Sequence, residues 1–293
     1  MNFLRLAATV KNERDAIKFF QREGVLLKQR RCTNGHKMRL KLTGGRQRWR
    51  CFHRTCRQEI SLKAGTWFKD CHLPFRTILL FIYCWAFEMT SIKFCKRELG
   101  ISKNTVVDFN NILREICAYN LLARPTVIGG PGLTVEIDES LFTKRKYNVG
   151  RVLREQWVFG GICRETKECF LYAVPDRRAT TLLSIIAESI RPGSTIISDS
   201  WAAYGGIANL NQHFTHLTVN HTYNFVDPNT GAHTQTVERG WNGYKARNRA
   251  RWGTHRTMLD SYLCEYMWRQ RLRNADAFEA ILFDMALGWP PEH

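Results

Sequence analysis

The sequence lacks a hydrophobic run long enough to cross a membrane. Its longest apolar stretch, ILLFIYCWAF at 78–87, is much shorter than the ~20 residues of a membrane-spanning helix. Residues 1–10 also lack the apolar core of a secretory signal and lead directly into KNERD. Internal repeats and low-complexity segments are absent as well. These absences predict a soluble protein of a reducing compartment, in which clustered cysteines bind metal rather than form disulfides.

Acidic residues are scarce relative to basic ones. The 293-residue chain has 26 Asp and Glu against 44 Lys and Arg, a net charge of +18. Such an excess favours a polyanionic partner, for which nucleic acid is the default. A basic housekeeping protein or a membrane-surface binder fits less well, because the charge is spread along the whole chain. With 44% hydrophobic residues, the chain can build two domains, or one large domain with an appendage.

The segment between residues 32 and 56 combines potential metal ligands with a predicted hairpin. Two basic, strand-like arms flank a turn at Gly44–Gly45, and each end of the hairpin carries two ligands. The ligands are Cys32, His36, Cys51 and Cys56. Four nitrogen and sulfur donors brought close by tight turns favour tetrahedral Zn²⁺. The Cys-x3-His and Cys-x4-Cys spacings are looser than usual, so His53 is an alternative ligand. Two unrelated cysteines and a surface histidine would leave unexplained how so small and polar a segment folds.

Residues 75–122 have a helical pattern throughout, and an earlier helix is expected over 11–23, ended by Gly24. Within the longer segment, Gly100 ends one predicted helix and Ser102 caps the next. A helix, a Gly-Ile-Ser turn and a second helix are typical of a helix-turn-helix, whose second helix presents its early residues to base edges. Those residues are Lys103, Asn104 and Thr105. An ordinary helical hairpin gives the same pattern, but the basic, zinc-binding neighbour favours contact with DNA.

After a linker formed by Pro125 and GGPG at 129–132, the pattern changes from helical to strand-like. Strands are predicted at 133–138, 156–163, 168–174, 195–199 and 216–221, and helices at 180–190 and from about Thr236. The second and third strands form a hairpin. Antiparallel strands followed by a helix and a parallel strand predict a mixed α/β sheet covered by helices.

Three carboxylates in this second half occupy positions typical of catalytic residues. Asp138 and Asp199 each end an apolar strand, and Glu238 lies near the start of a predicted helix. The separations are 199 − 138 = 61 and 238 − 199 = 39 residues. Singly, each acid is explained as a loop-facing residue, a cap or an acid favoured by the helix dipole. Glu139 is expected on the opposite face of its strand.

Together, the three acids predict a metal site. Three carboxylates that meet in a strongly basic protein need a cation between them, and Mg²⁺ or Mn²⁺ takes oxygen ligands. Two such ions activate a water or a 3′-hydroxyl and stabilise the leaving oxygen of an in-line displacement at phosphorus. The surrounding positive charge would then hold DNA at the site.

The motifs around the acids resemble those of a known family. A zinc-ribbon-like start, helices, and then E-I-D-E-S, I-S-D-S-W-x-A-Y and H-T-Q-T-V-E-R-x-W-x-x-x-K are similar to the Merlin superfamily of cut-and-paste DNA transposases. Related bacterial insertion-sequence transposases share this arrangement. The resemblance covers nearly the whole chain and implies a ribonuclease H-like fold whose metal-binding acids correspond to Asp138, Asp199 and Glu238. The segment CTNGH departs from the commoner Cys-Pro-x-Cys form, and we assign His36 to the place of the missing cysteine.

Further residues near the acids are predicted to contact DNA. Trp201 and Tyr204 are candidates for stacking on a frayed base, although core packing is favoured for at least one of them. His233 either contacts the scissile phosphate or belongs to a hydrogen-bond network at the helix start. Lys245 lies on the helix face of Glu238 and is placed to reach a phosphate. The remaining predicted contacts are Arg249 on that helix and Lys144, Arg145, Lys146 and Arg151 in a basic segment, for which a solvated hairpin is the alternative.

The sequence thus predicts three regions. These are a helix and zinc-ribbon-like module at 1–70, a helix-turn-helix DNA-binding region at 71–126 and a ribonuclease H-like catalytic domain at 127–293. The predicted function is a DNA transposase that hydrolyses the phosphodiester at transposon ends and joins the freed 3′-hydroxyl to target DNA. The alternatives are a domesticated DNA-binding regulator and a metal-dependent nuclease without strand transfer. The resemblance implies a homodimer or larger assembly on terminal inverted repeats, in the nucleus of a eukaryote or otherwise in the cytoplasm and nucleoid.

Overall fold

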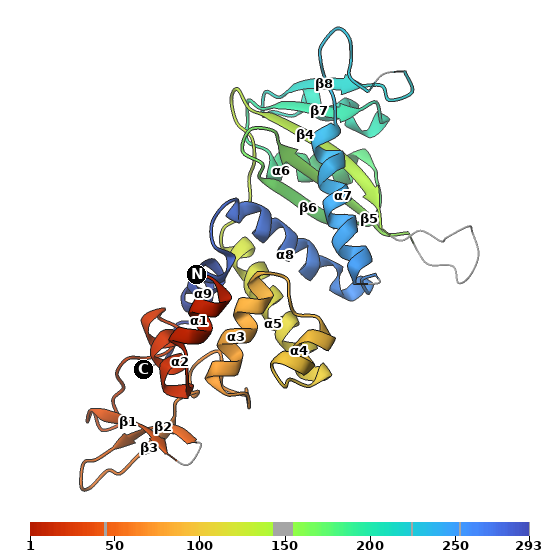
Figure 1. Cartoon of the computed structure of the whole chain (residues 1–293). Coiled ribbons are helices and arrows are strands. Elements are labelled where there is room, and N and C mark those ends of the chain that lie inside the picture. The colour runs from red at the N-terminus through yellow and green to blue at the C-terminus, as the bar shows by residue number, and fades with distance from the viewer. Residues whose placement is uncertain (44–45, 143–154, 224, 252, 293) are drawn as a thin grey trace. The chain divides into compact units, whose positions relative to one another are not determined.

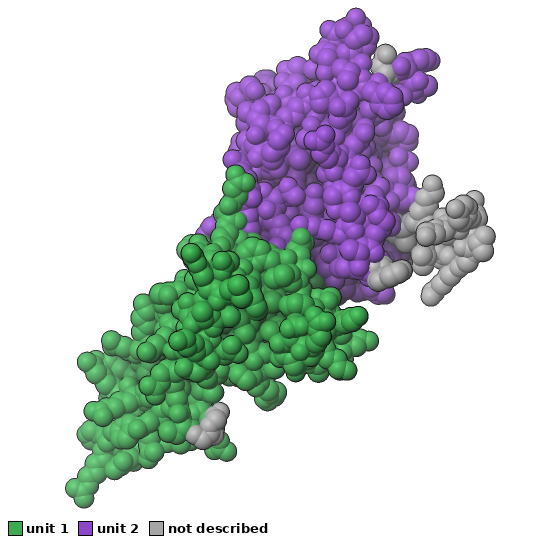
Figure 2. Space-filling model, viewed as in Figure 1, with its two compact units in different colours: residues 1–120, 274–293 green, residues 121–273 purple. Residues whose placement is uncertain are grey.

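The computed structural model describes all but a few short segments of the chain. The described residues are 1–43, 46–142, 155–223, 225–251 and 253–292. They divide into two compact units, of which unit 1 comprises Met1–Asn120 with Asn274–His293 and unit 2 comprises Leu121–Arg273 (Figures 1 and 2). The finer division into three regions stays a prediction. In the described part of the chain, no helix is both long and apolar enough to cross a membrane.

Unit 1 contains helices that pack around aromatic side chains. Its helices are α1 (Phe3–Thr9), α2 (Glu13–Arg22), α3 (Phe75–Ala86), α4 (Ile92–Glu98), most of α5 (Lys103–Ala123) and α9 (Ala277–Gly288). The apolar face of α2 buries Phe20, whose ring lies 5.0 Å from that of Phe68 and 6.0 Å from that of Phe75. Side chains are buried on every side of α3 from Ile78 onward, as its uniformly apolar sequence requires. These elements confirm the helices predicted over 11–23 and 75–122.

The connection between α4 and α5 is a tight turn. Gly100 has a φ of +65°, a left-handed conformation that glycine adopts without a steric penalty, and it follows the end of α4. Ser102 then accepts a hydrogen bond from the backbone N–H of Thr105 at 3.3 Å, as expected of a helix cap. Whether this helix pair acts as a DNA-reading helix-turn-helix stays a prediction.

Unit 1 also contains a three-stranded antiparallel sheet. Its strands, in order, are β1 (Met38–Thr43), β2 (Arg46–Cys51) and β3 (Glu59–Ser61). All of β1 pairs with β2, which confirms the predicted hairpin, whereas its turn at Gly44–Gly45 lies outside the described residues. One face of the sheet buries Met38, Trp49 and Cys51. The strand β3 was not predicted, because a short polar strand has no apolar alternation to reveal it.

Unit 2 is built on a five-stranded mixed sheet with the order β6-β5-β4-β7-β8. The strands are β4 (Thr134–Leu141), β5 (Trp157–Cys163), β6 (Cys169–Val174), β7 (Thr195–Asp199) and β8 (Thr215–Val219). The first three strands along the chain pair antiparallel, and β7 and β8 run parallel to β4. This arrangement confirms the predicted mixed α/β sheet and fits the ribonuclease H-like fold that the resemblance implied.

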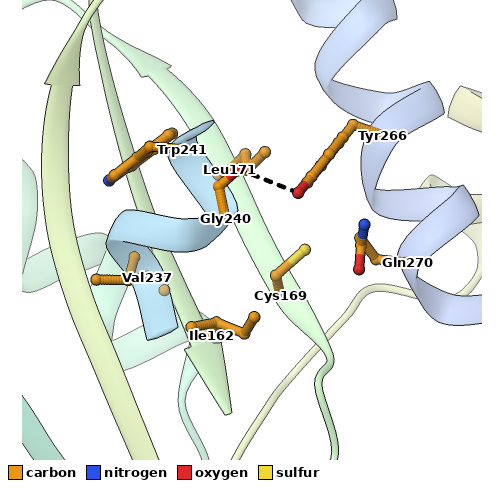
Figure 3. A pocket seen from close by; sticks show the side chains of 9 residues that line it. Ile162, Cys169, Leu171, Val237, Gly240, Trp241, Tyr266 and Gln270 are labelled. Carbon is orange, nitrogen blue, oxygen red and sulfur yellow. Dashed lines mark hydrogen bonds between the residues drawn. The ribbon is translucent and has the colours of Figure 1, made fainter. Parts of the chain in front are cut away.

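Helices cover both faces of this sheet (Figure 1). Two of them, α7 (Gln235–Ala250) and α8 (Leu259–Leu272), pack on one face, and α6 (Ala179–Ser189) and the 3₁₀ segment η2 (Ala202–Asn209) lie on the other. Figure 3 shows α7 and α8 enclosing a small apolar pocket over β5 and β6. In this pocket the hydroxyl of Tyr266 donates to the carbonyl of Gly240 at 3.2 Å and so links the two helices.

Candidate metal centres

The four ligands predicted for zinc come together in unit 1. The ligand atoms of the four side chains all lie within 4.8 Å of one another, and the residues are Cys32, His36, Cys51 and Cys56. A tight turn joins the first two, since Gly35 donates to the carbonyl of Cys32 at 2.8 Å. A second turn joins the last two, with the N–H of Cys56 donating to the carbonyl of His53 at 3.1 Å. One nitrogen and three sulfur donors at this spacing suit Zn²⁺.

The structure distinguishes the two candidate histidines. The Nδ1 atom of His36 lies 3.4 Å from Sγ of Cys32 and 3.8 Å from Sγ of Cys51. His53 lies outside this group, with its ring stacked on that of His36 at 3.9 Å and its Nδ1 atom 3.0 Å from Oγ1 of Thr55. His36 therefore supplies the fourth donor, and His53 covers it from the outside.

In unit 2, the predicted catalytic aspartates lie on adjacent parallel strands. The register pairs Thr134 with Thr195 and Glu136 with Ile197, an offset of 195 − 134 = 61 residues. The pairing ends at Glu136 and Ile197. Two residues further along each strand, Asp138 and Asp199 point to the same face of the sheet, because side chains alternate along a strand. Burial, the charge of Glu139 and the charge of Asp199 raise the pKa of Asp138 to about 7.

A buried acid that the sequence analysis left without a role fixes α7 against β4. Glu136 is fully buried and accepts hydrogen bonds from the backbone N–H groups of Thr236 and Val237, at 2.7 and 2.9 Å. Its other oxygen pairs with Arg164. A carboxylate at the first turn of a helix satisfies unpaired N–H groups and complements the helix dipole. Glu136 thus holds the start of α7 over the strand that carries Asp138.

The sequence contained a signal for this role of Glu136. It is an acid two residues before Asp138 on an apolar strand, and alternation places both side chains on one face of the sheet.

A tryptophan on α7 contacts Asp138 directly. The indole N–H of Trp241 donates to the carboxylate of Asp138 at 3.0 Å. The ring lies over Gly160, the residue of β5 that pairs with Asp138. A Cβ atom on Gly160 would lie 3.0 Å from this ring and 2.5 Å from Leu171, so glycine is what allows α7 to approach the sheet this closely.

The third predicted acid, Glu238, lies on α7 three residues before Trp241. Its side chain is 49% exposed and accepts a hydrogen bond from the hydroxyl of Thr234 at 3.1 Å, while Nε2 of His221 lies 3.7 Å away. Within the described ranges, the three acids do not form a compact ligand group like that of the cysteines. The structure therefore puts two of the acids on one face of the sheet and the third on α7, the helix whose Trp241 contacts Asp138.

The opposite face of β4 holds Glu139, as predicted. It accepts a hydrogen bond from the hydroxyl of Tyr204, and burial, opposed by that bond, raises its pKa. Tyr204 is only 1% exposed. The prediction that Tyr204 stacks on a base is therefore wrong, because the ring packs in the core and its hydroxyl is engaged with Glu139.

The other predicted DNA contacts differ in exposure. Trp201 is 42% exposed, and its ring lies 4.7 Å from the guanidinium of Arg177, which also stacks on Trp157 at 4.0 Å. The sequence analysis missed Arg177, whose charge acts on Glu139. His233 lies against Glu136, with Nδ1 3.6 Å from its carboxylate. This position favours a role in the polar network at the start of α7 over a contact with the scissile phosphate.

The remaining predicted contacts lie on helices or outside the described residues. Lys103, Asn104 and Arg249 are exposed, and Thr105 and Lys245 are partly exposed. The Lys245 ammonium lies 5.8 Å from the ring of Phe142, just beyond β4, which directs it toward the end of the strand that carries Asp138. Lys144, Arg145, Lys146 and Arg151 lie outside the described residues.

Comparisons with known proteins concern mainly unit 2. Residues 130–271, which lie within unit 2, match the family model of the ISXO2-like transposase domain. A protein of Haemophilus influenzae, described as an uncharacterized transposase-like protein, is 27% identical over 104 residues, covering 35% of this chain and 81% of its own length. These two matches support a transposase family. They do not single out the Merlin superfamily.

Two solved structures show weaker similarity. The HTLV-2 integrase catalytic core domain, solved in complex with magnesium, has 13% identity and a TM-score of 0.30, covering 47% of this chain and 85% of its own. A chain of the simian T-cell lymphotropic virus intasome, in complex with PP2A regulatory subunit B56 gamma, has 17% identity and a TM-score of 0.32, covering 62% and 67%. TM-scores this low do not support an inference about function.

Proposed function

We propose that this protein is a cut-and-paste DNA transposase of the Merlin type. In this proposal it hydrolyses the phosphodiester at transposon ends and joins the freed 3′-hydroxyl to target DNA. The observation that carries the proposal is the pair Asp138 and Asp199, which share one sheet face in the segment that matches a transposase domain. The basic composition, with a net charge of +18, supports DNA as the substrate.

The proposed roles of the acids follow from their surroundings. Asp138 and Asp199 would hold divalent ions, and a bound cation would oppose the rise that burial causes in the pKa of Asp138. Glu238 would complete the ligand set from α7. Bound Mg²⁺ or Mn²⁺ supplies a polarised water or 3′-hydroxyl and neutralises charge on the leaving oxygen.

Other residues of the chain would position these acids. Trp241 orients the carboxylate of Asp138 through its N–H, and Glu136 anchors the helix that carries Glu238. Lys245 is the proposed contact to a phosphate near the metals, from the same helix.

Unit 1 would bind the transposon ends. The proposal assigns zinc to the cluster of Cys32, His36, Cys51 and Cys56, and assigns base contacts to the exposed start of α5. Because transposition joins two ends, we also propose a dimer or larger assembly on DNA, with the protein in the nucleus of a eukaryote or the nucleoid of a bacterium.

The test is a cleavage and joining assay. Labelled DNA carrying the inverted repeats that flank the coding locus is incubated with the protein, a target plasmid and Mg²⁺, and products are separated on denaturing gels. Cleavage with joined product supports a transposase. Cleavage alone would replace the proposal by a nuclease, and binding without cleavage would replace it by a DNA-binding regulator.

A further inference from the structure

One face of the small sheet in unit 1 carries an unusual concentration of positive charge. Alternation along β1 and β2 places one set of side chains on the face opposite the buried Met38, Trp49 and Cys51. The cationic sheet face, as we call it, comprises Arg39, Lys41, Arg46, Arg48 and Arg50. Thr43 is the sixth residue that β1 and β2 contribute to it, so five of its six side chains on these strands are cationic.

The register makes this arrangement costly for the fold. Arg39 pairs directly with Arg50, and Lys41 pairs directly with Arg48. Like charges opposite each other on neighbouring strands are destabilising. Selection for stability alone would favour opposite charges at these paired positions. The arrangement is instead what a surface requires when an anion lies across both strands.

One acid compensates part of this charge. Glu59 on β3 brings its carboxylate oxygens to 3.2 Å from Nε of Arg48 and 3.3 Å from Nε of Arg50. Within the part of the chain that the structure describes, Arg39, Lys41 and Arg46 have no acidic partner, and all are exposed. The net charge of the face with Glu59 is therefore 5 − 1 = +4.

An exposed phenylalanine organises three of the cations. Phe52, directly after β2, is 38% exposed. The charged ends of Arg39, Lys41 and Arg50 lie 5.6, 5.3 and 5.5 Å from the centroid of its ring. Cation–π contacts of this length hold long side chains in place, so less conformational entropy is lost when an anion binds them.

A polar groove shares Arg46 and Arg48 with the face. It is also lined by Glu59, Ser61 and His72. Lys63 also lines it, but its ammonium donates to the backbone carbonyls of Cys71 and Leu73. The cation of this groove that stays exposed and unpaired among the described residues is thus Arg46, on the cationic sheet face itself.

We propose that the cationic sheet face binds the phosphodiester backbone of DNA without reading its sequence. The choice of DNA as the polyanion rests on the proposed function. The face offers charge spread over two strands and side chains held by Phe52, which suits contacts to phosphates along a backbone. It is separate in the chain from the start of α5, where base contacts are proposed.

The test measures the salt dependence of DNA binding by the full-length protein. Duplex DNA of arbitrary sequence and the corresponding single strand are titrated at several salt concentrations, without Mg²⁺ and without a chelator that would remove zinc. The test protein carries Arg39→Ala, Lys41→Ala and Arg46→Ala. Each lost phosphate contact should flatten the slope of log K against log salt by about 0.9 for duplex. We therefore expect a slope that is less steep by about 2 to 3, and a clear change on either form of DNA supports the proposal.

The matched control removes the same charge elsewhere in unit 1. It carries Lys11→Ala, Arg14→Ala and Lys18→Ala at or beside α2, all exposed, and should retain the wild-type slope. An unchanged slope of the test protein on both DNA forms, or an equal loss in the control, would overturn the proposal. If the triple variant loses zinc or melts early, Arg46→Ala alone replaces it, with an expected change of about 0.9.

The binding measurement is independent of catalysis. The variant Asp138→Asn should retain the wild-type slope. Absence of cleavage by the wild-type protein would contradict the proposed enzyme, whereas an unchanged slope contradicts only the binding face.

Discussion

The two candidate metal centres of this protein differ in how completely the chain assembles them. In unit 1, three thiols and an imidazole bring all their donor atoms within 4.8 Å of one another. In unit 2, Asp138 and Asp199 share a sheet face, whereas Glu238 stays half exposed and is hydrogen-bonded to Thr234. The same chain thus completes one ligand set and leaves the other open.

The chemistry of the donors explains this difference. A protonated thiol and a singly protonated imidazole are both neutral, so these side chains can approach one another without a metal. Carboxylates are charged when ionised and repel one another. At this site burial, and after it the charges of Glu139 and Asp199, raise the pKa of Asp138. In the proposed function, zinc would hold a fold together, whereas divalent ions in unit 2 would enter a site that keeps positions for water and phosphate.

The largest expected effect concerns zinc. Structural zinc sites contribute about 10–16 kcal/mol of apparent free energy in small zinc-binding folds. We therefore expect His36→Ala and Cys51→Ser to abolish zinc binding and unfold the sheet β1–β3, without unfolding unit 2. Metal analysis of the purified protein and limited proteolysis measure the two effects.

The neighbouring histidine provides the control for this prediction. His53→Ala removes the ring stacked on His36 but none of the four donors. It should retain one zinc ion per chain. If His53→Ala loses zinc and His36→Ala retains it, then His53 is the zinc ligand and His36 is not.

The second largest effect concerns catalysis. We expect Asp138→Asn, Asp199→Asn and Glu238→Gln each to reduce cleavage by more than about a thousandfold, since metal ions supply several kcal/mol of transition-state stabilisation. DNA binding should persist. Glu188→Gln, which removes an exposed acid on α6, should leave cleavage unchanged. Substantial cleavage by Glu238→Gln alone would show that the two aspartates act without the acid on α7.

Much of the fold could be predicted because its patterns are local. The strand predicted at 195–199 has the bounds of β7, and the helix predicted at 180–190 is within one residue of α6 at each end. Apolar runs bounded by turn residues carry this information in the sequence itself. By contrast, β3 has only three residues, one of them apolar, and they form a strand by pairing with β2. This pairing depends on tertiary structure, which a local sequence pattern does not reveal.

The candidate sites show the same limit. Asp138 and Asp199 could be found because each follows an apolar run. The prediction that Asp138 ends its strand is wrong, because β4 continues to Leu141 through its pairing with β5. The contacts of Glu136 with Thr236 and of Tyr204 with Glu139 join residues 100 and 65 positions apart. An aromatic residue shortly after Asp199 has the same sequence pattern whether it faces solvent or the core. The sequence therefore left Trp201 and Tyr204 equivalent, and packing separated them.

The third prediction uses the raised pKa of Asp138. Its carboxyl has a pKa of about 7 in the folded protein against 3.8 as the reference value. Between these values the folded state binds more protons than the unfolded state, so the free energy of unfolding falls as pH rises through this window. Asp138→Asn removes that fall and keeps an acceptor for Trp241. At pH 8 without added Mg²⁺, we expect the variant to be more stable by a few kcal/mol at most, on the order of the shift.

Urea unfolding at pH 5 and pH 8 measures this effect. At pH 5, the wild type and Asp138→Asn should differ less than at pH 8. Added Mg²⁺ should stabilise the wild type at pH 8 more than the variant, because it supplies the missing charge compensation. A variant that is less stable than the wild type at pH 8 would show that burial of Asp138 carries no electrostatic cost.

The smallest expected effect tests how closely α7 must approach the sheet. In Gly160→Ala, the new Cβ atom would lie 2.5 Å from Leu171 and 3.0 Å from the ring of Trp241. Overpacking of this kind costs about 1–3 kcal/mol, and the displaced indole would lose its hydrogen bond to Asp138. We expect a lower melting temperature and weaker cleavage together.

Gly240→Ala on α7 is the control, because its new Cβ atom meets no atom within 4 Å. Alanine favours the helix by up to ~1 kcal/mol, so this variant should have a higher melting temperature and unchanged cleavage. If Gly160→Ala lowers stability but not cleavage, the contact between Trp241 and Asp138 contributes only to the fold. The incomplete set of acidic ligands in unit 2 then does not depend on this contact.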